Sequence, residues 1–569
     1  MTIKFKSISN NNFLKAIDIS RLQFVIISCI WSLFISMGIF FFIEGGFQRL
    51  NPKNTGWISG DNLTAYVAQF FWVDTNWHLP LSSNPRYGNE FSSSLTYTGP
   101  SPLLSMIHKI LEINALDQLF GFWILANLFF QILLGIRVLR IINISRQLSL
   151  IGSVLFITPF FIFRIENHFW LISHFLILWA ICVLIKSRQN QEINQREVVT
   201  LVLISYFVNS YLLGMVFVIL ILAINELKVK VKKKILILLS VILTIAFSMF
   251  INDGFSGQGN FKESIRIILS STYGYHNFNL ISWLNPDTGL IAESDGLLNS
   301  SKVMTNLSST NISLGMTKGS YEGFLYLGLG LIILLLFAVT LKKQKIEIKK
   351  SSVIIGFIVV LYSITNRISI GSFEYKFHIW VYLQWALSVF RTSGRFMWIF
   401  AYLLIPYVLW KINSKMNHEK KKRFIILMGI SIQILDLAFP VAKIFEDKRI
   451  NVTNNRVSGE VPNQLKNLFE EHKRIEVWPV NDVILNNYAV LNYWAYKSGI
   501  STNLIYTSRE NVPKRVKMQL ETYNAICDGM IDPQNIYVVS EKYMNKFDSK
   551  CKIETLKKVN YQNQFYFYR

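Results

Sequence analysis

Charged residues are scarce in this chain of 569 residues. Asp, Glu, Lys and Arg make up 16% of it, whereas hydrophobic residues make up 51% and aromatic residues 14%. Soluble domains usually carry about a quarter charged residues, and the positive mean hydropathy of +0.33 departs from that class as well. The composition therefore excludes an ordinary soluble protein and favours one that lies largely within a membrane.

Acidic residues are fewer than basic ones, 35 against 58, which gives a formal net charge of +23. Such a charge can serve nucleic-acid binding, but the basic residues gather between apolar runs, at residues 228–234, 342–350 and 411–423. Lys and Arg concentrate in this way in the cytoplasmic loops of membrane proteins and beside anionic lipid headgroups. The pattern indicates membrane topology and lipid contact, with no nucleic-acid partner.

Cysteines are few, and none has the Cys/His spacing of a zinc site, so no metal site is predicted. Cys29 and Cys182 lie inside apolar runs, where we expect them to pack as small apolar side chains. Cys527 and Cys551 both lie in the polar C-terminal region. A disulfide between them is reasonable in an oxidising compartment, but two cysteines alone do not establish the pairing, and free thiols remain the alternative.

Motifs of the common soluble enzyme classes are also missing. The chain has no Walker-type glycine-rich loop, no nucleophile elbow and no ordered Ser, His and Asp set typical of a hydrolase. Function must therefore be sought in polar residues at the edges of the apolar runs.

Apolar runs dominate the first 440 residues. Backbone polar groups must pair within the segment in lipid, so a run of about 20 apolar residues predicts a spanning helix. About eleven spans are predicted, at residues 22–43, 116–136, 148–163, 169–185, 198–208, 211–224, 235–251, 321–341, 353–364, 396–410 and 424–439. The two short runs beside Asn209 are either two crossings or one kinked span.

The basic clusters also predict an orientation. With a cytoplasmic N-terminus, every cluster falls on the cytoplasmic side, provided that the chain crosses twice around Asn209 and residues 376–390 do not fully cross. Those residues include Trp380, Tyr382 and Trp385, which suit an interfacial or re-entrant helix. Such a topology suits the inner membrane of a bacterium and places the C-terminus on the periplasmic, extracytoplasmic side.

We divide the chain into a membrane domain, residues 1–440, and a soluble domain, residues 441–569. The membrane domain has two large outer loops, residues 44–114 and 252–320, of which the second is polar and expected to be partly mobile. Strand-like pieces alternate with amphipathic stretches in the C-terminal part. The predicted fold class is mainly α, a polytopic membrane helix bundle with a small extracytoplasmic α+β domain at the C-terminus.

The first outer loop contains the most informative carboxylate, Asp61. It follows Gly60 at the expected start of a short helix, residues 62–71, near the membrane surface. Asp61 is either a helix-terminal carboxylate at the positive end of the helix dipole, or a general base or cation ligand facing a cleft. Asp74 and Glu90 are rival carboxylates, which we expect to be solvated. Nearby ring-bearing side chains suit membrane anchoring or sugar stacking: Trp72, Trp77, His78 and Tyr87.

Two further polar groups lie at predicted membrane edges. The first is the turn with Glu166 and His168, followed by His174 deeper in the next span, where it serves either structural hydrogen bonding or substrate contact. The second is the pair Arg391 and Arg395, which we expect to share one helix face. They either anchor the chain to lipid phosphates or recognise a substrate phosphate at the membrane surface.

Several sequence blocks resemble an uncharacterised bacterial family of polytopic membrane proteins related to the GT-C glycosyltransferases. The resemblance covers most of the chain in order. Its blocks are Gly60-Asp61 with the FFWVDTNWHLPLSSNPRYG stretch, Ser173-His-Phe175, Asn285-Pro286, Tyr321 to Gly328, Arg391 to Phe396, Gln433 to Leu437, and Tyr496 to Asn503 followed by Tyr506 and Arg509. The family carries an Asp in a Tyr-Thr-Asp-Ser-Ile-Pro-like stretch, but this chain reads Tyr97-Thr-Gly-Pro-Ser-Pro102. If that Asp serves catalysis in the family, this departure implies either a different acceptor or an inactive protein.

The resemblance implies an activity. GT-C enzymes use a catalytic Asp or Glu in the first outer loop and a polyprenyl-phosphate-linked sugar donor, and Asp61 occupies the matching place. The implied protein transfers a sugar to a cell-surface glycan of the envelope, a polysaccharide, or to its lipid-linked precursor. Arg391 and Arg395 would hold the lipid phosphate, and Glu166, His168 and Glu322 would orient sugar hydroxyls. Participation of a divalent cation stays open.

Two other function classes fit the same residues. A transporter or flippase for a lipid-linked sugar would use the arginine pair without breaking a bond. A non-catalytic assembly component of the envelope would use the C-terminal domain to bind a partner. Transporters favour internal repeats and ionisable residues at mid-membrane, whereas the sequence has no evident repeat and its polar residues cluster at the outer edge, which favours an enzyme.

Overall fold

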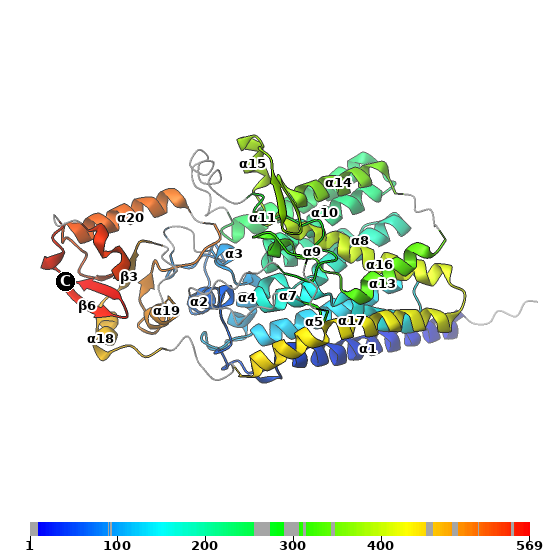
Figure 1. Ribbon diagram of the computed structural model, residues 1–569, viewed down its shortest axis with the longest axis horizontal. Helices are drawn as coiled ribbons and strands as arrows, with labels where there is room; N and C mark the ends of the chain where they lie inside the picture. The colour runs from blue at the N-terminus through cyan, green and yellow to red at the C-terminus, as the bar shows by residue number, and fades with distance from the viewer. Residues whose placement is uncertain are drawn as a thin grey trace, which may run out of the picture.

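The computed structural model describes residues 10–88, 90, 94–254, 273–288, 307–310, 314–342, 348–450, 459–480, 488–509, 511–547 and 551–569. The chain forms an elongated molecule in which a bundle of long helices adjoins a small domain built around a sheet (Figure 1). Much of the loop at residues 252–320, which the sequence predicts to be partly mobile, lies outside the described residues.

The bundle consists of apolar helices at the positions of the predicted runs. Its elements are α1 (Asn10–Ile43), α5 (Phe120–Ile141), α6 (Arg146–Gly152), α7 (Pro159–Asn167), α8 (Phe175–Asn190), α9 (Gln195–Val208), α10 (Ser210–Glu226), α11 (Val231–Ile251), α13 (Leu329–Thr340), α14 (Lys350–Ile364), α16 (Trp398–Lys415) and α17 (Glu419–Ile450). Within the described residues, six helices are long and apolar enough to cross a membrane, or seven if the bent segment 146–166 counts as one span. A mainly helical fold with several apolar helices of spanning length is therefore confirmed, and the count of eleven spans stays a prediction.

Two helices rather than one kinked span surround Asn209. The side chain of Asn209 accepts a hydrogen bond from the backbone of Tyr211 and starts α10 as α9 ends. Near the beginning of α9, Glu197 forms an ion pair with Lys186 of α8. Near the end of α9, the carbonyl of Phe207 accepts a hydrogen bond from the hydroxyl of Ser101. Because α10 then packs beside α8 and α9, the chain reverses direction at Asn209.

Basic residues from separate helices meet at one end of the bundle, which we call the basic end. Glu197 bonds Arg137 and Lys186, and the backbone of Lys228 donates to Gln191. Lys349 donates to the carbonyls of Asn225 and Glu226. The C-terminal domain lies at the opposite end of the molecule, which we call the domain end (Figure 1).

The C-terminal domain contains a five-stranded mixed sheet. Its strands are β3 (Arg474–Trp478), β4 (Ser501–Thr502), β5 (Asn535–Ser540), β6 (Lys557–Tyr561) and β7 (Gln564–Tyr568), in the order β4-β3-β5-β7-β6. The first three strands in this order are parallel to one another, and β7 runs antiparallel to both of its neighbours, β5 and β6. The helices α18 (Asn463–Glu471), α19 (Tyr488–Lys497) and α20 (Val512–Cys527) complete the domain. The predicted small C-terminal domain is present, and it starts later than residue 441 because α17 continues to Ile450.

The first loop attaches this domain to the bundle. The loop forms α2 (Asp61–Val73), α3 (Leu95–Thr98) and α4 (Pro102–Ile110), and α19 packs on α2. Tyr87 pairs with Thr502 as a short parallel extension of the sheet. The backbone of Gly88 donates to the Thr502 carbonyl over 2.8 Å. The domain is therefore docked on the first loop rather than tethered by a linker alone.

Docking overturns one expectation for the first loop, because Glu90 pairs with Arg474 of the C-terminal domain. Asp74 accepts a hydrogen bond from Arg86 of the same loop at 3.0 Å, and its side chain is 46% exposed, so it remains solvated. Of the ring-bearing side chains of this loop, Trp72 and Tyr87 are buried, whereas Trp77 is exposed and contacts Trp72. The Tyr87 hydroxyl bonds that of Tyr488 in the docked domain.

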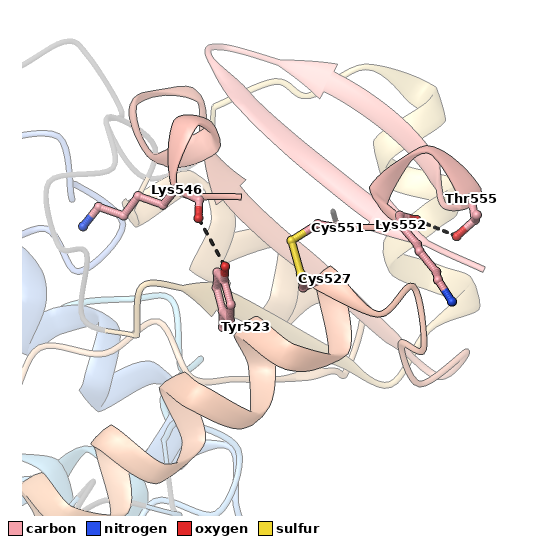
Figure 2. Close-up of a disulfide and its surroundings, with 6 residues drawn as sticks. All are labelled: Tyr523, Cys527, Lys546, Cys551, Lys552 and Thr555. Carbon is pink, nitrogen blue, oxygen red and sulfur yellow. Dashed lines mark hydrogen bonds between the residues drawn. A yellow bond between two sulfur atoms is a disulfide. The ribbon is translucent and has the colours of Figure 1, made fainter. Parts of the chain in front are cut away.

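A disulfide joins Cys527, at the end of α20, to Cys551 (Figure 2). Hydrogen bonds flank it on both sides: the hydroxyl of Tyr523 donates to the carbonyl of Lys546, and the Lys552 backbone donates to the carbonyl of Cys527. The bond closes a segment that contains β5, the central strand of the sheet.

The double variant Cys527→Ser/Cys551→Ser should unfold at a lower temperature than the wild type, because a disulfide typically contributes ~2–4 kcal/mol by restricting the unfolded chain. Thermal unfolding of the purified chain measures the effect, and Cys182→Ser is the matched control. Thiol labelling of the denatured, unreduced wild type should modify Cys29 and Cys182 alone. Modification of all four cysteines would contradict the bond.

Candidate functional site

The candidate site lies at the domain end of the bundle and begins with Asp61. Gly60, just before α2, has φ +58° and ψ −139°, a conformation that glycine adopts with little strain. This turn makes Asp61 the first residue of α2, where the helix dipole favours a negative charge. The Asp61 side chain is 30% exposed. It is therefore a carboxylate that a ligand can reach.

His168 lies between two carboxylates. Its Nδ1 is 3.7 Å from Oδ2 of Asp61, and its Nε2 is 3.5 Å from Oε1 of Glu322. The ring also stacks at a tilt on Trp170, with 5.4 Å between ring centroids. Since His168 ends α7, this contact links α7 to α2 and to the segment before α13. One imidazole thus connects three parts of the chain.

Glu322 is buried between two arginines. It lies in the turn η5 (Ser320–Gly323), and its Oε2 accepts hydrogen bonds from Arg164 at 2.8 Å and from Nε of Arg395 at 3.0 Å. Burial by itself would raise the pKa of Glu322, but the charges of Arg395 and Arg164 hold that pKa well below its usual value. Glu322 is therefore an ionised carboxylate at neutral pH, and its charge is neutralised inside the protein.

Arg395 and Arg391 do not share a helix face, which corrects the sequence prediction. Residues 393–397 form a 3-10 turn, and α16 begins only at Trp398. A side chain at Gly394 would come within 2.6 Å of the backbone of Asn277, so glycine permits this tight path. Arg395 points inward onto Glu322 and over the ring of Tyr211. Arg391 is exposed and, within the described residues, makes no hydrogen bond or ion pair.

The C-terminal domain contributes Tyr506 to the site. Its backbone donates to the Tyr87 hydroxyl at 3.3 Å, which fixes the segment above the first loop. The negative charge of Asp61, and then burial, raise the pKa of the Tyr506 hydroxyl to about 12, while Arg391 acts in the opposite direction. A single hydroxyl therefore senses both Asp61 and Arg391, which come from distant parts of the sequence.

Glu166 and His174 lie outside this cluster. Glu166 pairs with Lys448 at 2.6 Å, and Lys448 in turn pairs with Glu44 at 3.1 Å, in a buried network that joins α1, α7 and α17. His174 is fully enclosed, donates or accepts a hydrogen bond with the Tyr402 hydroxyl at 2.8 Å and packs on Trp398. Of the two roles open to His174, the structure therefore favours structural hydrogen bonding.

Two site residues were not assigned a role from the sequence. Arg164 belongs to the same turn as Glu166 and His168, and the sequence alone assigns it no role of its own. An arginine that interrupts an apolar run nevertheless indicates a buried partner. Tyr506 has no local signal of its own. Within the described chain, His, Cys, Asp and Glu form no group of three that could hold a metal ion. Asp61 and Glu322 lie on opposite sides of the His168 ring rather than converging.

Replacing Glu322 by Gln should destabilise the protein by ~3–5 kcal/mol, because two buried guanidinium groups lose their counter-charge. The matched control is Glu374→Gln, which breaks a partly exposed pair with Arg367 and should change stability by about 1 kcal/mol or less. Thermal unfolding of both purified variants checks the difference. Equal, small effects would contradict the role of Glu322.

Residues 34–438 match the family model described as a domain of unknown function, DUF6311. No curated protein matches the sequence significantly. The matched region contains Asp61, Arg164, His168, Glu322 and both Arg391 and Arg395, whereas Tyr506 lies beyond it. Because the match covers more than half of the chain, this protein belongs to the DUF6311 family.

Proposed function

We propose that the protein is a GT-C-type glycosyltransferase of a bacterial inner membrane. It transfers a sugar from a polyprenyl-phosphate donor to a cell-surface glycan or its lipid-linked precursor. The observation that carries the proposal is the presence of two reachable, opposite charges at the domain end of an apolar bundle. Within the described residues no arginine pairs with the Asp61 carboxylate, and Arg391 is an exposed cation whose charge acts on the same Tyr506 hydroxyl as that of Asp61.

The proposed topology follows from the two ends of the bundle. Basic clusters favour the cytoplasmic side, so the basic end faces the cytoplasm and the domain end faces the periplasm. Helices occur at all eleven predicted runs, including the shorter α10, α13 and α14. We propose that all of these cross the membrane, which places Asp61 and Arg391 at its outer surface, where a lipid-linked donor presents its phosphate.

In the proposed reaction, a hydroxyl of the acceptor attacks the anomeric carbon of the donor sugar. Asp61 accepts the hydroxyl proton as the new glycosidic bond forms. The bond between the anomeric carbon and the phosphate oxygen breaks, and the lipid phosphate leaves with an additional negative charge. Arg391 stabilises that charge by a charge-assisted hydrogen bond. A phosphate leaving group needs no proton, so a second catalytic carboxylate is not required.

The buried residues support this chemistry indirectly. Arg395 is fully engaged with Glu322, so we assign it a positioning role and leave donor binding to Arg391. Nε2 of His168 lies 3.5 Å from Glu322 and Nδ1 lies 3.7 Å from Asp61. Only a ring that carries protons on both nitrogens can present an N–H to both carboxylates, and in that form it attracts the Asp61 carboxylate. His168 is thus a positioning residue for the proposed base.

The alternatives differ in what they require of Asp61. A flippase for a lipid-linked sugar would need the cation Arg391 but no base, and a non-catalytic envelope component would need neither. Transporters usually place ionisable groups at mid-membrane. Here the cluster of Asp61, His168, Glu322 and the arginines lies beside the docked domain, which favours an enzyme.

Asp61→Asn should reduce sugar transfer by ~10²-fold or more while donor binding is retained, because the base is lost but the shape and much of the hydrogen bonding remain. Asp74→Asn, which breaks an ion pair on the loop surface, is the matched control and should remain active. Glycan mass analysis of complemented cells and a donor-binding assay provide the two measurements. Wild-type transfer by Asp61→Asn would refute the base.

Arg391→Ala should weaken donor binding, because the exposed cation for the phosphate is lost, whereas Arg391→Lys should restore part of it. Titration of the purified protein with a polyprenyl-phosphate sugar measures both variants. If Arg391→Ala binds the donor as tightly as the wild type, the phosphate site lies elsewhere.

The proposed orientation predicts that alkaline phosphatase fused after residue 569 is active, because this enzyme folds only outside the cytoplasm. The same fusion after residue 342, near the basic end, should be inactive. The reverse pair of results would invert the topology.

A further inference from the structure

A β-hairpin projects from the side of the bundle near the domain end. It consists of β1 (Arg367–Ile370) and β2 (Phe373–Lys376), and the short helix α15 (Val381–Leu387) follows it (Figure 1). The chain turns at Gly371, whose φ is +59°. Within the described chain, the two strands form a sheet of their own. A two-stranded hairpin is at best marginally stable by itself, so what covers its two faces matters.

The hairpin exposes its apolar face, the one that a hairpin of a soluble protein would bury. Side chains alternate between the faces of a strand, and Ile370 pairs with Phe373 while Ile368 pairs with Tyr375, so these four share one face. That apolar face points away from the protein: Phe373 is 65% exposed and Tyr375 is 59% exposed. A soluble hairpin would bury these side chains.

The polar face packs on the protein through β1, whereas Glu374 and Lys376 of β2 are exposed. Ser369 is fully buried and accepts a hydrogen bond from Asn277 at 2.6 Å. Asn279 bonds both the backbone N–H and the carbonyl of Gly371, at 3.0 and 2.8 Å. Arg367 and Glu374 pair with each other on the same face, at 3.3 Å. These contacts fix the orientation of the hairpin and hold its apolar face outward.

The exposed apolar face continues the outer surface of α14. That helix ends at Ile364, just before β1, and it exposes a stripe of apolar side chains at helical spacing: Val353, Ile354, Phe357, Ile358 and Leu361. A helix of 15 residues rises ~22 Å, less than the ~30 Å of a hydrocarbon core. β1 follows α14 directly in the chain and contacts it, so the apolar face of the hairpin lies beyond the domain-side end of this stripe.

The ring-bearing side chains of this region match a membrane interface. Trp380 is 67% exposed and Tyr382 is 48% exposed, and no residue of α15 is buried. Trp and Tyr concentrate at the headgroup level of membranes, together with Lys and Arg. The outer edge of β2 has backbone groups that need water or headgroup partners, which excludes a position deep in hydrocarbon.

We propose that the hairpin and α15 form an anchor in the lipid headgroup layer on the domain side of the membrane. Phe373, Tyr375 and Trp380 contact the upper acyl chains, and the polar face holds the anchor to the bundle. The carbonyl of Val389, just after α15, accepts a hydrogen bond from Arg509 of the C-terminal domain. The anchor therefore also sets Arg391 at the level of the lipid phosphates. This inference does not depend on the proposed enzyme activity.

Spin labels on adjacent residues of β2 test the anchor. Single cysteines at Phe373 and Tyr375 on the apolar face, and at Glu374 and Lys376 on the polar face, are introduced in the full chain with Cys29→Ser and Cys182→Ser. Trp380→Cys provides a position outside the sheet. Each labelled protein is placed in vesicles of phosphatidylcholine and phosphatidylglycerol, and collisions with oxygen and with a water-soluble nickel complex are compared.

Labels at 373, 375 and 380 should collide with oxygen several-fold more, relative to nickel, than labels at 374 and 376. Equal exposure of all five labels to nickel would overturn the proposal, since the face would then lie in water. Spin–spin broadening between chains at 373 and 375 would overturn it as well, because a second copy of the chain would then cover the face.

Discussion

The structure depends on the burial of one carboxylate, Glu322, between two arginines. A charge enclosed in an apolar bundle is tolerated only when it is paired and hydrogen-bonded, and Glu322 meets that condition with Arg164 and Arg395. These residues come from α7, from the turn before α13 and from the turn before α16. The pairing therefore fixes three distant segments at the domain end. Asp61 and Arg391 take no part in this pairing, and a ligand can reach both of these charges.

The C-terminal domain is held firmly at this end of the molecule. It is held to the first loop by the Tyr87–Thr502 extension of its sheet, by the Glu90–Arg474 pair and by the hydroxyls of Tyr87 and Tyr488. These contacts place Tyr506 on the first loop, where the charge of Asp61 raises the pKa of its hydroxyl. A second buried network, Glu44, Arg49, Lys448 and Glu166, joins α1 and α7 to the end of α17, from which the chain leaves for the domain. Both networks fix the position of the domain relative to the bundle.

The sequence predicts the local features of this protein well, because they follow from composition over short windows. Apolar runs locate the helices, and Gly60 locates the start of α2 at Asp61. The sequence leaves open whether Asn209 separates two helices, which the structure decides. The number of spans is harder to obtain, because shorter helices such as α13 and α14 do not reach spanning length by themselves.

Side-chain partners across the fold are not predictable in the same way. The spacing of Arg391 and Arg395 suggests one helix face, but the close approach of Gly394 to Asn277 imposes a 3-10 turn and separates them. Glu90 is paired because a domain some 400 residues further along the chain docks on its loop. His174 is satisfied by Tyr402, which belongs to another helix. Each of these depends on contacts between elements that no local pattern encodes.

The central claim is that Asp61, Arg391 and Tyr506 form one site for a lipid-linked sugar. An experimental structure of the full chain in lipid, with a polyprenyl-phosphonate sugar bound as an inert donor, tests it most directly. The account predicts the phosphonate within hydrogen-bonding distance of Arg391 and the sugar between Asp61 and Tyr506. A phosphonate bound at the basic end, or a sugar with no contact to Asp61, would contradict it.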